Sequence, residues 1–189
     1  MNNQRIRAFI AIKFNKQIKS LILKAQDKLK EYHANIKWVN LENTHITLQF
    51  LGNIDQSQIE IISKTITNIS KNHHPFLIKT TRIEMFPAQS PKIISLGINK
   101  KENNLKNLAD DISISLAKVG FLREREFSAH ITLGRIKNLK KMDQLKKDIQ
   151  DFDFNKEIKK NINSLTLFKT TLSQTGPIYQ EISSFTLKY

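Results

Sequence analysis

The chain has 189 residues, no cysteine and a formal net charge of +14, with 31 lysines and arginines against 17 aspartates and glutamates. Without cysteine it can hold no disulfide, no thiolate metal site and no cysteine nucleophile. The length suits a single domain with its own core, and the excess of positive charge favours a polyanionic partner such as nucleic acid. A second interpretation stays open, in which the lysines reflect a biased composition and form an ordinary solvated surface.

No segment is apolar for long enough to cross a bilayer. Near the N-terminus, Lys13 interrupts the apolar run before it reaches the length that a signal peptide needs. We therefore expect a soluble, cytoplasmic protein that does not engage a membrane, and we expect a monomer.

The first half of the chain predicts strands and helices in alternation. Residues 5–14 are typical of a strand, and Asn15 is placed to cap a helix with one apolar face, formed by Ile18, Leu21, Ile22, Ala25 and Leu29. A short strand is expected at 36–39, then a strand that ends near Leu51 with Gly52 and Asn53 as a turn, and then a helix at 57–70.

The second half repeats this theme. Strands are expected at 76–86 and 93–98, a helix at 104–119 that Gly120 terminates, a further strand around 129–135, and a lysine-rich helix at 142–149. Residues 151–155 are expected to form a loop, and strands at 165–172 and 179–187 to form a hairpin through Gly176 and Pro177. The pattern predicts an α+β fold of antiparallel strands with outer helices, organised as one domain over residues 1–189.

A four-residue string, His-Ile-Thr-Leu, occurs twice, at residues 45–48 and again at 130–133. On a strand, residues two apart share a face, so His45 and Thr47 would point one way while the apolar residues enter the core. The second copy would do the same with His130 and Thr132. We expect the two copies to lie on equivalent strands of two lobes and to meet at one site.

Two histidines and two hydroxyl groups suit the cleavage of a phosphate ester. One imidazole can take a proton from the attacking nucleophile while the other gives a proton to the leaving oxygen, and hydroxyl donors can hold the remaining phosphate oxygens. A purely structural role is the alternative for either histidine alone. A zinc site is disfavoured because threonine is a poor zinc ligand and no thiolate is present, so we expect no metal and no cofactor. His73 and His74 are expected to lie exposed at a helix end.

The motifs together resemble the two-histidine (2H) phosphoesterases, and most closely the RNA 2',3'-cyclic phosphodiesterases formerly called 2'-5' RNA ligases. The resemblance covers nearly the whole chain, through residues 7–11, 44–52, 127–135, 167–170 and 176–179. It implies a bilobal α+β fold with a central groove, and metal-independent hydrolysis of RNA 2',3'-cyclic phosphate ends to 2'-phosphates, with 2'-5' RNA ligation as the reverse reaction.

The resemblance also implies roles for single residues. His130 would activate water and His45 would protonate the departing 3' oxygen, while Phe50 and Arg135 would sandwich the terminal base. The alternatives are core packing for Phe50 and a surface ion pair for Arg135. Thr170 stands where the family usually has serine in the closing hairpin.

Three functions remain under consideration. The leading hypothesis is an RNA-end phosphodiesterase. The second keeps the same site but acts on 2'-5' linked oligonucleotides or small cyclic nucleotides. The third, motivated by the net charge, is a protein that binds RNA ends without catalysis.

Overall fold

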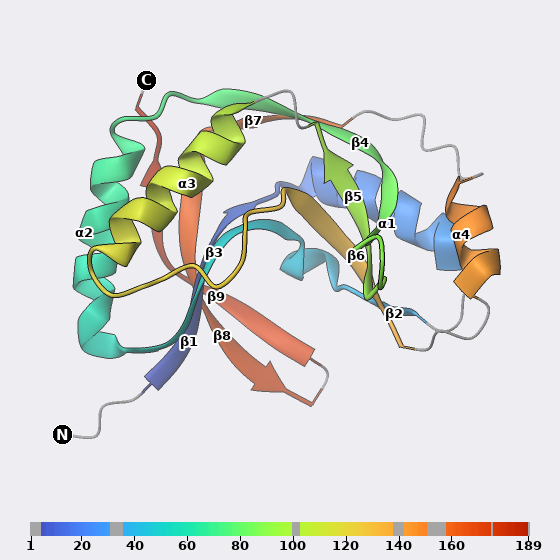
Figure 1. Cartoon of the computed structure of the whole chain (residues 1–189), viewed down its shortest axis with the longest axis horizontal. Coiled ribbons are helices and arrows are strands. Elements are labelled where there is room, and N and C mark those ends of the chain that lie inside the picture. The colour runs from blue at the N-terminus through green and yellow to red at the C-terminus, as the bar shows by residue number, and fades with distance from the viewer. Residues whose placement is uncertain are drawn as a thin grey trace.

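Two antiparallel sheets with helices outside them make up the computed structural model, which describes residues 5–30, 36–99, 103–137, 142–150, 158–174 and 176–188 (Figure 1). In chain order, the elements are β1 (Arg5–Lys13), α1 (Lys16–Lys30), β2 (Ile36–Trp38), η1 (Leu41–Asn43), β3 (His45–Asp55), η2 (Gln56–Gln58), α2 (Ile59–Ser70), β4 (Phe76–Phe86), β5 (Ile93–Ile98), α3 (Asn103–Ala117), β6 (His130–Ile136), α4 (Met142–Gln150), β7 (Lys159–Ile162), β8 (Ser164–Ser173) and β9 (Gly176–Thr186). The expected α+β architecture is confirmed.

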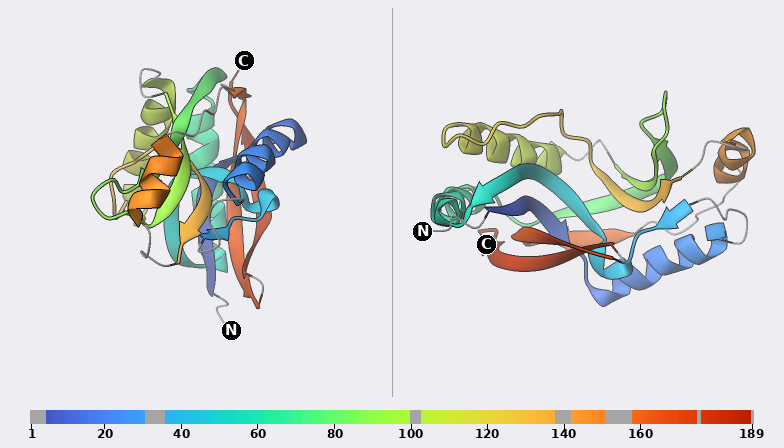
Figure 2. Two further views of the ribbon diagram at one scale, coloured as in Figure 1. Left: turned by 90° about the vertical axis from the view of Figure 1, so that its right-hand side faces the viewer. Right: turned by 90° about the horizontal axis from the view of Figure 1, so that it is seen from below.

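The two sheets do not correspond to successive halves of the chain. The first has the order β3-β1-β8-β9 and the second the order β2-β6-β5-β4-β7. The C-terminal hairpin β8–β9 therefore completes a sheet begun by β1 and β3, while β2 joins the sheet of the second half. Figure 2 shows the two sheets beside each other, with β8 and β9 in red on one side and β5 and β6 in green to gold on the other.

The helices follow the same interleaved pattern. α1 packs against β6 of the second sheet, whereas α2 and α3 lie side by side and pack against β9 and β3 of the first sheet (Figure 1). The amphipathic spacing of the helices explains this, because each buries one apolar stripe. The stripe of α1 consists of Ile18, Ile22, Ala25 and Leu29. The stripe of α3 consists of Leu105, Leu108, Ile112 and Leu116. Side chains from both sheets and all four helices join one continuous apolar cluster.

Several local expectations are confirmed. The backbone N–H of Ile18 donates to Asn15 Oδ1 at 3.1 Å, so Asn15 caps α1. Gly120 has a φ of +94° just after α3, where a left-handed residue ends the helix. The strands β4, β5, β8 and β9 lie within a residue or a few of their expected bounds.

Other expectations need correction. Gly52 and Asn53 form no turn, because β3 continues to Asp55 and Gly52 pairs with Ala8 of β1. Gly52 instead has a φ of +70° next to a break in the β1–β3 register, so its conformational freedom serves an irregularity inside the strand. β7 was not anticipated, because Lys-Lys-Asn-Ile has no apolar alternation. The loop expected at 151–155 lies outside the described residues.

Of the two adjacent histidines, His74 is exposed but His73 is not. The His73 side chain is only 15% exposed, and its Nε2 lies 2.9 Å from Asp111 Oδ2 of α3. This pair links the end of α2 to the neighbouring helix, so the expectation that both rings are exposed is wrong for His73.

Candidate active site

The two copies of His-Ile-Thr-Leu open strands β3 and β6 and have the same burial pattern. Over seven residues from each histidine, the order is half-buried, buried, half-buried, buried, buried, exposed and half-buried. The two successive buried residues, at the fourth and fifth positions, break the alternation of a regular strand. The two strands are in contact with each other at the junction of the two sheets. The motifs are therefore equivalent in structure as well as in sequence.

The break in alternation comes from a matching β-bulge in each copy. In β3, Ile10 pairs with Gln49 and Ala11 pairs with Thr47, which leaves Leu48 as an extra residue. The β6 copy leaves Leu133 extra in the same way, between the pairs Ile94–Gly134 and Ser95–Thr132. Each extra residue lies three positions after its histidine.

The bulges determine which side chains share a face with the histidines. In a regular strand, residues five apart point to opposite faces. Directly paired residues of an antiparallel ladder share a face; Phe50 pairs with Phe9, and His45 pairs with Lys13. Phe9 and Lys13 are four residues apart on β1 and share a face, so Phe50 lies on the same face as His45. By the same reasoning, Arg135 opposite Ile93 lies on the face of His130 opposite Gly97.

A buried glutamine supports the bulge in β6. The Gln26 side chain of α1 donates from Nε2 to the carbonyl oxygens of Val39 and Leu133, at 2.9 and 2.8 Å, and the Val39 N–H donates to the Leu133 carbonyl at 2.9 Å. Gln26 is only 2% exposed. The carbonyl of the extra residue thus has two donors, which offsets the cost of burying a backbone group that has left the ladder.

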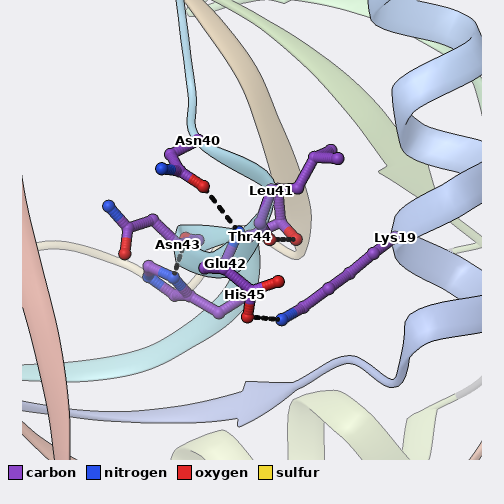
Figure 3. Close-up of polar contacts among 7 residues, drawn as sticks. All are labelled: Lys19, Asn40, Leu41, Glu42, Asn43, Thr44 and His45. Atoms are coloured by element: carbon purple, nitrogen blue, oxygen red, sulfur yellow. Dashed lines mark hydrogen bonds and ion pairs between the residues drawn. The ribbon is translucent and has the colours of Figure 1, made fainter.

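The start of β3 is built by the one-turn helix η1 (Figure 3). The Asn40 side chain accepts from the Glu42 N–H at 2.9 Å, and the Thr44 hydroxyl donates to the Leu41 carbonyl at 2.6 Å. An ion pair between Lys19 Nζ and Glu42, at 2.5 Å, ties this turn to α1. The turn therefore places the Asn43 carbonyl directly beside the His45 ring.

Both imidazoles are oriented by a backbone carbonyl two residues earlier. His45 Nδ1 lies 2.7 Å from the Asn43 carbonyl oxygen, and His130 Nδ1 lies 2.8 Å from that of Ser128. A carbonyl oxygen only accepts, so each Nδ1 carries a hydrogen and donates it. In the neutral form, Nε2 of each ring then carries no hydrogen, and this nitrogen is the atom that can accept or deliver a proton.

The surroundings of the two rings differ. His45 Nε2 is 2.9 Å from Thr47 Oγ1, and since this nitrogen lacks a hydrogen in the neutral ring, the hydroxyl donates to it. Among the described residues, His130 Nε2 has no such partner. The His45 ring packs between Phe9 and Tyr179, at centroid distances of 4.9 and 5.3 Å, whereas the His130 ring stacks on Phe86 at 5.0 Å.

These environments disfavour the charged form of both histidines. Burial lowers the pKa of His45 from 6.5 to about 4; the Asn43 carbonyl opposes this, and the nearby charges of His130 and Arg135 add to it. Burial also lowers the pKa of His130, against the Ser128 carbonyl, and Arg135 contributes again. The charge of His130 is thus one of the influences that lower the pKa of His45, and the strands that carry the two rings are in contact.

Phe50 and Arg135 both lie exposed at this site. Phe50 is 63% exposed, so core packing is the wrong explanation for it, although its ring centroid lies 6.1 Å from that of Phe9. Arg135 is exposed, and within the described part of the chain no carboxylate pairs with its guanidinium. The surface ion pair considered for Arg135 is therefore not formed within the described residues. Thr132 is half-buried on the same face as His130.

Tyr179 of β9 also contacts the site, and sequence reasoning missed it. Its ring meets His45 and Phe9 edge-on, at 5.3 and 4.9 Å between centroids. Burial raises the pKa of its hydroxyl, while Arg135 and Arg7 act in the opposite direction. Its position after Gly176 and Pro177 marks the hairpin, but nothing in that pattern indicates that the ring reaches β3.

Two cavities differ in their relation to the histidines. One of about 220 Å³ is lined by His45, by Tyr179 and by the ion pairs Lys13–Glu181 and Lys19–Glu42. A larger one of about 430 Å³ lies between α1 and β7 and is lined by asparagine, glutamine, lysine and apolar side chains, without a histidine. We place the candidate site at the histidines, because proton-transfer groups converge there and not at the larger cavity.

The residues around the histidines favour an anion. In the described ranges, no three side chains among histidine, cysteine, aspartate and glutamate are grouped so that they could hold a metal ion. Two neutral imidazoles, two threonine hydroxyls and one guanidinium are suited to bind a phosphate group and to move protons around it. Within the same described ranges, no helix is long and apolar enough to cross a membrane.

Comparison with known proteins gives consistent results. The model of the family described as "LigT like Phosphoesterase" matches residues 12–94 and 96–179. An RNA 2',3'-cyclic phosphodiesterase of Methanocaldococcus jannaschii is 36% identical over 95% of this chain and 100% of its own, and one of Aquifex aeolicus is 32% identical over 96% and 97%. The crystal structure of E. coli LigT without ligand superimposes with a TM-score of 0.78 at 19% identity, covering 98% of this chain and 99% of that one. E. coli LigT has also been crystallised with 3'-AMP.

Proposed function

Because this chain belongs to the LigT-like phosphoesterase family, we propose that it hydrolyses the 2',3'-cyclic phosphate ends of RNA to 2'-phosphates. The observation that carries this proposal is the pair of imidazoles on equivalent strands, each with Nδ1 donating to a backbone carbonyl and Nε2 left for proton transfer. The curated relatives, which share about a third of their residues with this chain over nearly its full length, support the choice of substrate.

The reaction needs one proton to be removed and one to be supplied. A water oxygen attacks the phosphorus and loses a proton to one imidazole, while the bond between phosphorus and the 3' oxygen breaks and that oxygen gains a proton from the other imidazole. The phosphate stays on the 2' oxygen. Each proton transfer contributes roughly 10²–10⁴ to the rate, so loss of either ring is expected to be severe.

The unequal surroundings of the rings support His130 as the base and His45 as the acid. The lone pair of His130 Nε2 has no partner in the described structure and is available to a water molecule. His45 Nε2 already lies beside a hydroxyl oxygen, and its low pKa makes the protonated ring a strong proton donor to an alkoxide-like leaving group. An anionic substrate beside this ring raises its pKa and favours the required charged form.

The other residues on this face would hold the substrate. Thr47 and Thr132 would donate hydroxyl hydrogens to the non-bridging phosphate oxygens, where charge develops. Phe50 and Arg135, which the two bulges turn to the histidine face, would stack on the two sides of the terminal base. The exposed guanidinium and the exposed ring are then explained by a ligand that covers them.

Replacement of either histidine tests the proposal. We expect His45→Ala and His130→Ala each to lower kcat on a 2',3'-cyclic mononucleotide by about 10²-fold or more, with little change in the thermal melt. The same change at exposed His74 is the matched control and should leave kcat unchanged. The product should elute with the 2'-monophosphate standard and not with the 3'-monophosphate.

Two results would contradict the proposal. Full activity in either variant would remove that histidine from the reaction. A wild-type protein that binds an RNA end with a 2',3'-cyclic phosphate but forms no product would favour a protein that only holds RNA ends.

A further inference from the structure

A row of three polar side chains crosses the first sheet beside the histidine face. Arg7 of β1 pairs directly with Thr170 of β8, and Thr170 pairs directly with Tyr179 of β9. Directly paired residues share a face, so all three side chains project to one side of the sheet. β1 pairs with β8 without a break over Arg7 to Ala11, and alternation along it puts Arg7 on the face of Phe9.

This face is the one that carries the catalytic candidates. Phe9 contacts His45 and pairs with Phe50, and the Tyr179 ring contacts both Phe9 and His45. Arg7 lies two residues beyond Phe9, and is therefore the first cation along β1 past the position where we place the terminal base. The row extends the site away from the histidines without a change of face.

Charge points to an anion in this place. Arg7 is exposed, and among the described residues no carboxylate pairs with it, whereas Arg5 on the same strand pairs with Asp55 at 3.5 Å. Arg7 and Arg135 both act on the ionisation of the Tyr179 hydroxyl, so guanidinium groups from the two sheets approach it from separate strands. An unpaired guanidinium next to two hydroxyl groups is suited to a phosphate group.

The chemistry of the substrate identifies which phosphate this would be. A cyclic phosphate uses both the 2' and the 3' oxygen of the last ribose, so the RNA backbone can continue only from its 5' oxygen. We propose that Arg7, with the hydroxyl groups of Thr170 and Tyr179, forms a second phosphate subsite that binds the phosphodiester on the 5' side of the terminal nucleotide. The inference rests on the proposed function and specifies its substrate as an RNA strand, in preference to a mononucleotide.

Two substrates with the same terminal base separate this subsite from the reaction centre. A 2',3'-cyclic mononucleotide lacks the 5' phosphodiester, and a trinucleotide with a 2',3'-cyclic end has it. We expect Arg7→Gln to lower kcat/KM for the trinucleotide about tenfold, the scale of a charge-assisted hydrogen bond. The same variant should leave kcat/KM for the mononucleotide within about twofold, which also reports that the protein is folded.

Further variants sharpen the test. Arg5→Gln removes the same charge from the same strand and should leave the preference for the trinucleotide unchanged, because Arg5 already has a carboxylate partner. Thr170→Val should lower kcat/KM for the trinucleotide by roughly threefold, the scale of one lost neutral hydrogen bond. Loss of one phosphate contact should also reduce the slope of log KM against log salt concentration by about 0.7 in Arg7→Gln.

The outcomes are distinct. A wild-type protein without activity on either substrate would overturn the proposed function and this inference with it. An active wild type whose substrate preference is unchanged in Arg7→Gln would overturn the subsite alone. Equal losses in Arg5→Gln and Arg7→Gln would also overturn the subsite, because they would show a diffuse effect of charge.

Discussion

The His45 and His130 rings share one pattern of hydrogen bonding. It explains how two imidazoles that pair with no carboxylate among the described residues can be held in a defined tautomer. Each Nδ1–H donates to the carbonyl two residues earlier, so the strand that carries the ring also orients it. A carbonyl stabilises an imidazolium less than a carboxylate would. Burial therefore dominates, and the pKa of each ring falls below 6.5.

The direction of these shifts predicts the pH dependence of the reaction. The reaction that we propose needs one protonated and one neutral ring, and this form of the free enzyme is most populated between the two pKa values of the coupled pair. Because both pKa values are lowered, we expect kcat/KM on a 2',3'-cyclic mononucleotide to be greatest between about pH 4 and 6.5. Above this range, kcat/KM should fall about tenfold per pH unit, as the required proton is lost.

The comparison with kcat gives the control for this prediction. The anionic substrate raises both pKa values in the complex, so the maximum of kcat should lie at a higher pH than that of kcat/KM. Initial rates over a range of substrate concentrations, at constant ionic strength from pH 4 to 9, give both kcat and kcat/KM at each pH. A kcat/KM that rises steadily from pH 6 to 9 would contradict the lowered pKa values.

At the scale of elements, the bulges in β3 and β6 bring Phe50 and Arg135 to the face that carries the histidines. The bulge in β6 lies where Gly134 faces the short strand β2. A Cβ atom at Gly134 would lie 2.5 Å from Ile36 Cγ2 and 3.1 Å from Trp38 Cε3. Glycine is therefore required there by the close approach of β2, and not by its backbone angles.

We expect Gly134→Ala to lower the free energy of unfolding by about 1–3 kcal/mol, because the methyl group must displace the packed side chains of Ile36 and Trp38. Urea unfolding measures this loss. Gly52→Asn is a suitable control, since no atom lies within 4 Å of a Cβ there and asparagine tolerates a φ of +70°. A Gly134→Ala protein as stable as the wild type would show that β2 does not press on the bulge.

The elements also show what local sequence can predict. β4, β5 and α3 have clear periodicity and marked ends, and they lie close to their expected bounds. The bulges leave no local signal, since Leu48 and Leu133 look like any core residue. The faces of Phe50 and Arg135 followed only from the family resemblance, because regular alternation puts them opposite their histidines.

At the scale of the whole molecule, the path of the chain joins the two sheets. The first sheet needs both β1 and the terminal hairpin β8–β9, and the second takes β2 from the first half. Pairing between distant strands is not encoded in local pattern, which is why the sequence suggested two successive lobes. For the same reason it indicated the strand that carries Tyr179 but not the contact of that ring with His45.

This interleaving predicts that neither sheet is stable alone. We expect a single cooperative transition in urea, because both sheets share one apolar cluster and each is completed by a distant part of the chain. Trp38, the only tryptophan, lies in β2 and reports the second sheet by fluorescence, whereas far-UV circular dichroism reports both. The two curves should have the same midpoint. Separate midpoints would show that the lobes unfold independently.

The hydrogen bond from the Thr47 hydroxyl to His45 Nε2 has a consequence for how the buried ring acquires its charge. A phosphoryl oxygen that takes over this hydroxyl removes the donor that stabilises the neutral ring, and brings a negative charge to the nitrogen it uncovers. Proton uptake and ligand occupancy are thereby coupled in a single event on the β3 side. In the proposed reaction, His45 would be neutral in the free protein and would gain its proton when the ligand binds.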